Sequence, residues 1–477
     1  MDAVEKVLSA ALDAALAAGA TDATARFVAR EAERIRVRND VQEAQHAVSE
    51  GLFVSARVPG ATGASSLAMP LRALSSPDAE RAAREAVDAA RATAMLYGRK
   101  VVVGLGPPGL SHAITTAGQD PFAVPMAKKI ALVREAACAA RASERVDIAM
   151  AQLRAMRERV VLGVRAKDQV ARFHVRDHTL VGVGVRVSVG AVGRFVVRSA
   201  PAVGGGVWSG GFEHVDAMDV VALGKRTGRE ALAFVDAPRC ATRVCDVVLD
   251  ATLAGPLLYE TLGRAQEADE PSFARAQGAA SVASAALTVS CDPLGAGVVA
   301  SAGVDDEGVR PATVSLLANG RLGAWLTDRD AAAEHAVLAT GSARAGDHRE
   351  APRVHLGHLV VSPGAGGDVE ALCAGIADGL LLVGARTIAV DPGRGAFRAV
   401  AELAWEIKNG KRRGLVRGAA IGGELAAVFL KCDAVGSIET ASSFGTWRRK
   451  APGRRPLPVG HRAVALRLRQ VSVVGFE

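Results

Sequence analysis

The sequence predicts an α+β protein in two parts: an N-terminal α/β-mixed domain and a largely antiparallel β C-terminal domain. Three observations support this class. The chain has 477 residues, enough for two or three domains with ample apolar core. A few segments have the apolar spacing of helices, whereas many others alternate as strands do. Asp236-Ala237-Pro238-Arg239 is typical of a linker, so we expect domains over 1–236 and 243–477.

The N-terminal domain is predicted to begin with a helix that leads into a meander of alternating strands. The expected order is helix 1–19, strands over 24–69, helices 77–97 and 123–143, strands over 146–199, and helix 216–235. The glycine-rich segment 104–109 does not open a predicted helix, so it carries no dinucleotide-binding or P-loop fingerprint.

The C-terminal domain is predicted to open with a strand and a helix. Cys245–Asp250 is a short apolar run that is typical of a buried strand. We expect the helix over Leu258–Asp269 and mostly strands after it. The final run, Val464–Val474, alternates well enough to form a strand.

The Leu258–Asp269 segment carries the most informative motif of the chain. Its Glu260, Gly263, Glu267 and Asp269 resemble the TldD/PmbA family of metallopeptidases, whose motif is His-Glu-x-x-x-His, commonly followed by x-x-Glu-x-Asp. Weaker similarities to the same family extend over nearly the whole chain. They include Gly19–Asp22, Arg34–Asn39, Asp120–Pro125, Asp305–Gly308 and Leu317–Leu322.

The residues that the resemblance assigns to zinc are replaced here. Tyr259 and Arg264 hold the two histidine positions. The family's third ligand is a cysteine near the C-terminus, in a loop that precedes Pro-Val-Gly. The best match to that loop places Trp447 at the cysteine, ahead of Pro458-Val459-Gly460. The motif is therefore degenerate at all three ligand positions.

These replacements predict a protein without a zinc cofactor. A catalytic zinc needs about three protein ligands and an open position for water, whose pKa it lowers to about 7. Arg264 is always cationic and has no lone pair to give, and Tyr259 would have to ligate as a phenolate. Without metal-bound water, Glu260 has nothing obvious to activate, so we interpret it as an inactive relic of the catalytic base.

A structural role for the same residues follows from helical spacing. Glu260 and Arg264 are four residues apart with the acid first, the favourable orientation for an ion pair. Arg264 also precedes Glu267 by three residues. One interpretation is that the helix is kept for its architecture, with Arg264 as an internal counter-ion. The alternative is a new polar site built from these side chains.

The charge pattern argues against nucleic acid as a partner. The net charge of +8 is modest for this length, arginines are spread along the chain, and only 4% of the residues are aromatic. Lys408–Arg413 contains Asn-Gly between strand-like runs, which predicts a hairpin turn. The basic residues of 448–450 and 454–455 predict either a solvated loop or a contact with an acidic partner or peptide.

Other features predict a cytoplasmic protein that does not span a membrane. No apolar run approaches the ~18 residues that a membrane helix needs. The first residues, Met1–Lys6, include early acids and do not resemble a signal peptide. The six cysteines are scattered without a zinc spacing, so we expect reduced and mostly buried thiols.

The resemblance also implies partners. TldD/PmbA proteins often work as two-chain assemblies that degrade or trim peptides, with zinc on one chain only. We therefore expect a non-catalytic subunit, a pseudo-peptidase, that supports peptide proteolysis or maturation by a zinc-competent partner in a heterodimer. Two alternatives stay open. The chain is either an enzyme with altered, zinc-independent chemistry at the old site, or a peptide-binding or scaffold homodimer.

Overall fold

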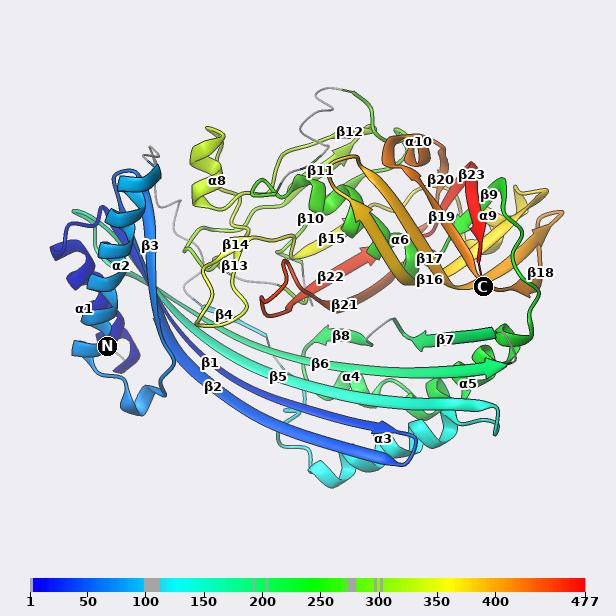
Figure 1. The fold of residues 1–477 in the computed structure, drawn as a ribbon, viewed down its shortest axis with the longest axis horizontal. Coiled ribbons are helices and arrows are strands. Elements are labelled where there is room, and N and C mark those ends of the chain that lie inside the picture. Colours follow the sequence, from blue (N-terminus) through cyan, green and yellow to red (C-terminus); the bar gives the residue numbers. More distant parts are fainter. Residues whose placement is uncertain are drawn as a thin grey trace.

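The computed structural model describes most of the chain (Figure 1). The described residues are 3–97, 112–115, 117–191, 194–202, 205–270, 272, 280–295, 298–300 and 303–476. The glycine-rich segment 104–109 lies outside them.

Four long antiparallel strands form a curved sheet in the N-terminal half, in the order β6-β5-β1-β2. Shorter strands extend it: β3 pairs with β2, while β4, β7 and β8 pair with β6. The bounds are β1 Asp22–Arg38, β2 Val41–Val58, β3 Ala61–Leu67, β4 His112–Ile114, β5 Val146–Ala166, β6 Arg172–Ala191, β7 Arg194–Ala200 and β8 Gly206–Ser209. The strands predicted over 24–69 and 146–199 are confirmed.

Helices cover one face of this sheet, because alternate residues of each strand are apolar (Figure 1). Phe27 of β1 packs with α1 and α2 at one end, and Ile35 and Val37 pack with α3 and α5 at the other. Arg26 and Arg30 point to the opposite face, toward the C-terminal half. The helices are α1 Ala3–Ala17, α2 Ser76–Tyr97, α3 Met126–Ala140, α4 Glu213–Asp216 and α5 Val220–Asp236, close to the predicted positions.

The C-terminal half is largely β, so the predicted α+β class is confirmed. Its seven-stranded sheet has the order β16-β9-β23-β19-β17-β18, with β20 beside β23. A second group, β12-β11-β10-β15-β22-β21, continues through β8 into the long sheet, which has 14 strands in all. Because that sheet joins both halves, the division at 236/243 stays a prediction about the domains.

The C-terminal strands are mostly antiparallel, with parallel pairing of β9 with β16 and of β15 with β22. Their bounds are β9 Arg243–Leu249, β10 Val289–Cys291, β11 Val314–Ala318, β12 Arg321–Leu322, β13 Ala343–Arg344, β14 Arg353–Val354, β15 His358–Val361, β16 Asp378–Asp391, β17 Ala396–Lys408, β18 Lys411–Val416, β19 Ala419–Glu424, β20 Cys432–Val435, β21 Ser442–Arg448, β22 Leu457–Ala463 and β23 Leu466–Gly475. The last strand confirms the prediction for Val464–Val474. Short helices are α8 Arg329–Glu334, α9 Val369–Ala374 and α10 Leu425–Phe429.

Three further sequence expectations have an outcome in the structure. Asn409 and Gly410 have φ angles of 51° and 74° and form the predicted hairpin turn between β17 and β18. All six cysteines are free, and only Cys138 is exposed. Within the described ranges, no helix is long and apolar enough to cross a membrane.

Candidate functional site

A buried helix carries the motif into the centre of the C-terminal half. Helix α6, Ala251–Leu258, is apolar except for Thr252 and lies in the main core. Asp250 caps it by accepting the Leu253 N–H at 2.9 Å. The helix then widens into a π turn over Tyr259–Gly263 and tightens into a 3₁₀ turn over Arg264–Gln266.

The predicted helix over 258–269 is therefore wrong at both ends. It begins seven residues earlier, because Asp250 supplies the cap. It also ends before Glu267, which is extended (φ −73°, ψ 111°) and forms a β-bridge with Leu326. Glu267 and Asp269 consequently approach the motif from a loop. In the π turn the Arg264 N–H donates to the Tyr259 carbonyl, so these two residues, five apart in the sequence, are one helical turn apart.

Tyr259 is a structural phenol in this site. Its side chain is buried, its hydroxyl donates to the Leu356 carbonyl at 3.0 Å, and its ring meets His461 edge-on at 5.0 Å. Burial, and then the charges of Glu267 and Glu260, raise the pKa of Tyr259 well above its usual value. The phenol therefore stays neutral at physiological pH.

Glu260 lies between two arginines. Its carboxylate is 3.3 Å from Arg264 Nη1 and 3.1 Å from Arg448 Nη1. Arg264 also reaches Glu270 at 3.1 Å and Glu267 at 3.9 Å. The predicted pairing of Arg264 with Glu260 and Glu267 is confirmed. The Glu260 carboxylate is therefore engaged by two guanidinium groups of its own chain.

A lysine from the C-terminal loop neutralises the remaining acids. Lys450 Nζ is 3.1 Å from Glu267 and 2.7 Å from Asp269, and it also donates to the Val354 carbonyl. Burial opposes ionisation of Glu267, but Lys450, with His355 and Arg264, lowers its pKa to about 2. The Glu267 carboxylate also accepts the Leu356 N–H at 2.8 Å. This side chain is therefore a fixed anion with a fixed counter-ion.

Gly263 is the remaining motif residue, and its role is steric. A Cβ at this position would lie 2.4 Å from Leu356 Cδ2, so the buried Leu356 side chain would have to move. Glycine therefore lets the π turn pack against the Leu356 segment.

The structure places Trp447 away from these charges. In β21 the side chains alternate, so Thr446 and Arg448 face the motif, where Thr446 Oγ1 lies 3.5 Å from His461 Nε2. Trp447 points to the other face and packs against a small cluster that includes Met156. Its assignment to the cysteine position stays a prediction from the sequence, while Arg448 and Lys450 are the residues of this loop that contact the motif.

Comparison with known proteins adds the family. The profile described as the PmbA/TldA metallopeptidase C-terminal domain matches residues 242–475. A protein named metalloprotease from Methanothermobacter thermautotrophicus is 28% identical over 404 residues, 82% of this chain and 83% of that protein. The metalloprotease MJ0996 of Methanocaldococcus jannaschii is 31% identical over 229 residues, 47% of this chain and 50% of that protein. The chain belongs to the TldD/PmbA family.

Solved structures show that the TldD/PmbA fold extends over the whole chain. TM0727 of Thermotoga maritima, a putative modulator of a DNA gyrase, superimposes with a TM-score of 0.74 at 17% identity, covering 99% of this chain and 100% of that one. TldE of Thermococcus kodakarensis gives a TM-score of 0.74 at 13% identity, with the same coverage. At these identities the likeness concerns the fold.

The TldD/PmbA fold implies zinc, and the residues of this chain do not fit it. Tyr259 uses its hydroxyl as a donor and stays protonated, so it offers no phenolate. The charged groups of Arg264, Arg448 and Lys450 lie among the carboxylates where a cation would have to enter. No group of three His, Cys, Asp or Glu side chains within the described ranges has the geometry of a metal site.

Sequence reasoning missed the partnership between this loop and the motif acids. Lys450 was expected in a solvated loop or against an acidic partner, yet it contacts acids of its own chain, 183 residues away in the case of Glu267. Arg455 likewise pairs with Asp347 at 2.7 Å. The only available signal was complementary charge in two distant segments, which does not identify a contact.

Proposed function

We propose that the chain is a non-catalytic subunit of a TldD/PmbA-type assembly, which supports peptide proteolysis or maturation by a zinc-competent partner. The observation that carries the proposal is the internal neutralisation of the motif. Arg264, Arg448 and Lys450 satisfy the carboxylates of Glu260 and Glu267 without a metal. A peptidase site needs a polarised water, and these side chains provide no group to activate one.

The retained architecture favours a role beside a partner over a loss of all function. Gly263 and the apolar helix α6 are kept, and the acids hold the motif in place through contacts with the C-terminal loop. Such a subunit would shape the peptide-binding space while the partner cleaves. The partner is expected to be another TldD/PmbA-type chain. A homodimer is the competing arrangement.

The test combines metal content with activity. The purified chain should retain almost no zinc after mild chelation, measured by elemental mass spectrometry, and should not cleave unfolded peptides alone. Mixed with a zinc-competent TldD/PmbA chain from the same genome, it should co-elute with that chain and change its rate of peptide cleavage. Cleavage by the partner is followed with and without this subunit.

Two outcomes would overturn the proposal. Stoichiometric zinc that resists chelation would mean that other ligands are recruited. Cleavage by the chain alone, abolished by Glu260→Gln but not by the exposed control Glu439→Gln, would favour an enzyme with altered chemistry.

A further inference from the structure

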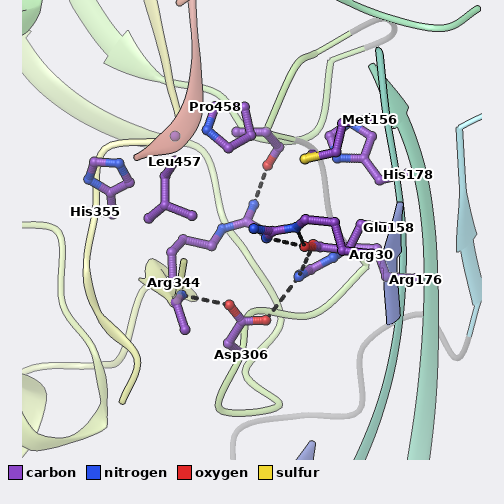
Figure 2. Close-up of a pocket in the computed structure, with 13 residues that line it drawn as sticks. Arg30, Met156, Glu158, Arg176, His178, Asp306, Arg344, His355, Leu457 and Pro458 are labelled. Atoms are coloured by element: carbon purple, nitrogen blue, oxygen red, sulfur yellow. Dashed lines mark hydrogen bonds and ion pairs between the residues drawn. The ribbon is translucent and has the colours of Figure 1, made fainter. Parts of the chain in front are cut away.

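A small cavity next to the motif lies between the long sheet and the C-terminal loops. Arg30, Glu158 and Arg176 line it from the long strands, Asp306 from a loop, and Arg344 from the short strand β13 (Figure 2). Its volume is about 30 Å³. Since one water needs roughly 10–15 Å³ on this measure, the cavity has room for about two polar atoms.

The cavity carries more positive than negative charge. Glu158 is shared by Arg30, at 2.8 Å, and Arg176, at 3.6 Å. Asp306 pairs with Arg176 at 3.0 Å and with a further arginine, Arg26, at 3.1 Å. The carboxylates of Glu158 and Asp306 are thus already paired with three arginines. One more cationic side chain lines the cavity.

Arg344 is that remaining cation. It donates to the Ala300 carbonyl, and within the described ranges it forms no ion pair with a carboxylate. Burial and then the nearby Arg176 lower the pKa of Arg344. Because a guanidinium stays protonated in proteins, this direction marks an unfavourable position for the charge, which the nearby Asp306 and Asp305 offset only in part.

An open cleft of about 330 Å³ continues from the cavity, with Arg30 and Met156 lining both. Further arginines line the cleft. Arg34 and Arg154 are directly opposite in the β1–β5 ladder, where like charges repel. Glu33, the one acid among the described residues that line the cleft, has its carboxylate bound to Lys129.

Three buried N–H groups of this cleft have no acceptor among the residues that the structure describes. They are Nε of Arg34, Nε of Arg154 and the indole Nε1 of Trp447. Buried donors in native proteins are nearly always bonded, so these three point to an acceptor that binds from outside. Together with Arg344, they place donors and positive charge along the open cleft and in the smaller cavity that adjoins it.

We propose that the cleft and cavity bind an acidic peptide, with its backbone along Arg34, Arg154 and Trp447 and one carboxylate in the cavity at Arg344. A carboxylate presents two oxygens, which matches the room available, and pairs with a guanidinium in bidentate geometry. A phosphodiester within a nucleic acid continues on both sides and could not enter a cavity of this size. That the ligand is a peptide rests on the proposed function. That the ligand is an anion follows from the charge of the site alone.

Calorimetric titration of the full chain tests the inference. The probes are a short aspartate-containing peptide with a free C-terminus, its C-terminal amide, and the same peptide with asparagine in place of aspartate. The acidic peptide should bind, with an affinity that falls as salt is added. Weaker binding of the amide identifies the terminal carboxylate in the cavity, and weaker binding of the asparagine peptide identifies a side chain.

Variants locate the site. Arg344→Met should weaken peptide binding about tenfold or more, since it removes a charge-assisted pair. Arg154→Met, in the half-buried cleft, should weaken it by a smaller factor. Arg394→Met is the matched control, because Arg394 is 86% exposed in the turn between β16 and β17, and it should leave binding unchanged. The free Arg344→Met chain should melt at the same or a higher temperature than the wild type.

The inference fails if all three peptides bind alike, or if none binds. It also fails if a single-stranded oligonucleotide binds more tightly than the acidic peptide. If Arg344→Met does not fold, unchanged binding by Arg154→Met is enough to overturn the inference. These results are independent of zinc content and partner-dependent cleavage, so failure here leaves the proposed function testable on its own terms.

Discussion

Replacing Lys450 by methionine is the sharpest perturbation of the motif. The ammonium lies between Glu267 and Asp269, and only 8% of the lysine side chain is exposed. Methionine keeps most of the aliphatic length but removes the charge. The carboxylate of Glu267, 1% exposed, then loses its main counter-ion while remaining buried.

The size of the effect can be worked out from these contacts. Removing one partner of a buried ion pair costs about 3–5 kcal/mol, because the other charge is left uncompensated. The protein can avoid the bare charge by protonating Glu267. Between an ordinary pKa of about 4.3 and pH 7, that costs about 4 kcal/mol. We therefore expect the Lys450→Met chain to lose about 3–5 kcal/mol of unfolding free energy at pH 7.

The pH dependence gives the prediction a sign. In the wild type the pKa of Glu267 is lowered to about 2, so its stabilisation is present above its ordinary pKa and is lost only as the pH falls toward 2. In Lys450→Met, burial dominates and raises that pKa above its ordinary value. The variant should therefore lose stability as the pH rises from about 4 to 7, and its deficit relative to the wild type should be smaller at pH 5 than at pH 7.

Thermal and urea unfolding at pH 5 and pH 7 provide the assay. The double variant Lys450→Met with Glu267→Gln removes the orphan charge, keeps an acceptor for the Leu356 N–H, and should recover most of the loss. Lys411→Met, at the exposed start of β18, is the control and should change stability by less than about 0.5 kcal/mol. A Lys450→Met chain as stable as the wild type at pH 7, or no rescue by the double variant, would refute the reasoning.

Three further predictions concern the same half of the chain. Tyr259→Phe should lower the free energy of unfolding in urea by about 0.5–1.5 kcal/mol, because it removes one hydrogen bond. In the wild type, the phenolate absorbance of Tyr259 should be seen near pH 11 only after unfolding, and the variant should lack it. Burial beside other acids raises the pKa of Asp328 to about 7, so its charged form destabilises the fold above that pH. Asp328→Asn still caps α8 and should raise the melting temperature more at pH 8 than at pH 5. An equal shift at both pH values would contradict this. A triple variant that restores the family's ligands, Tyr259→His, Arg264→His and Trp447→Cys, should bind zinc weakly. Adding Lys450→Met should increase the amount of zinc per chain, measured by elemental mass spectrometry. No increase would show that Lys450 does not block the site.

Much of the fold could be predicted because it depends on local patterns. Alternation along β1 assigns Phe27 and Ile35 to one face and Arg26 to the other, and Asn409-Gly410 adopts the left-handed angles of a tight hairpin. The motif around Glu260 was enough to identify the family. Helix ends were less predictable, because the cap at Asp250 and the π turn depend on what packs against them.

The sequence by itself determined the period of each element and the family of the chain, since both are properties of neighbouring residues. Only the tertiary structure decided which charges neutralise the motif. Lys450 meets Glu267 across 183 residues, because β21 and β22 bring the C-terminal loop over α6. Only the strand register directs Arg448 toward the motif and Trp447 away from it. Long-range electrostatics depends on distances that the fold creates, and no local pattern encodes them.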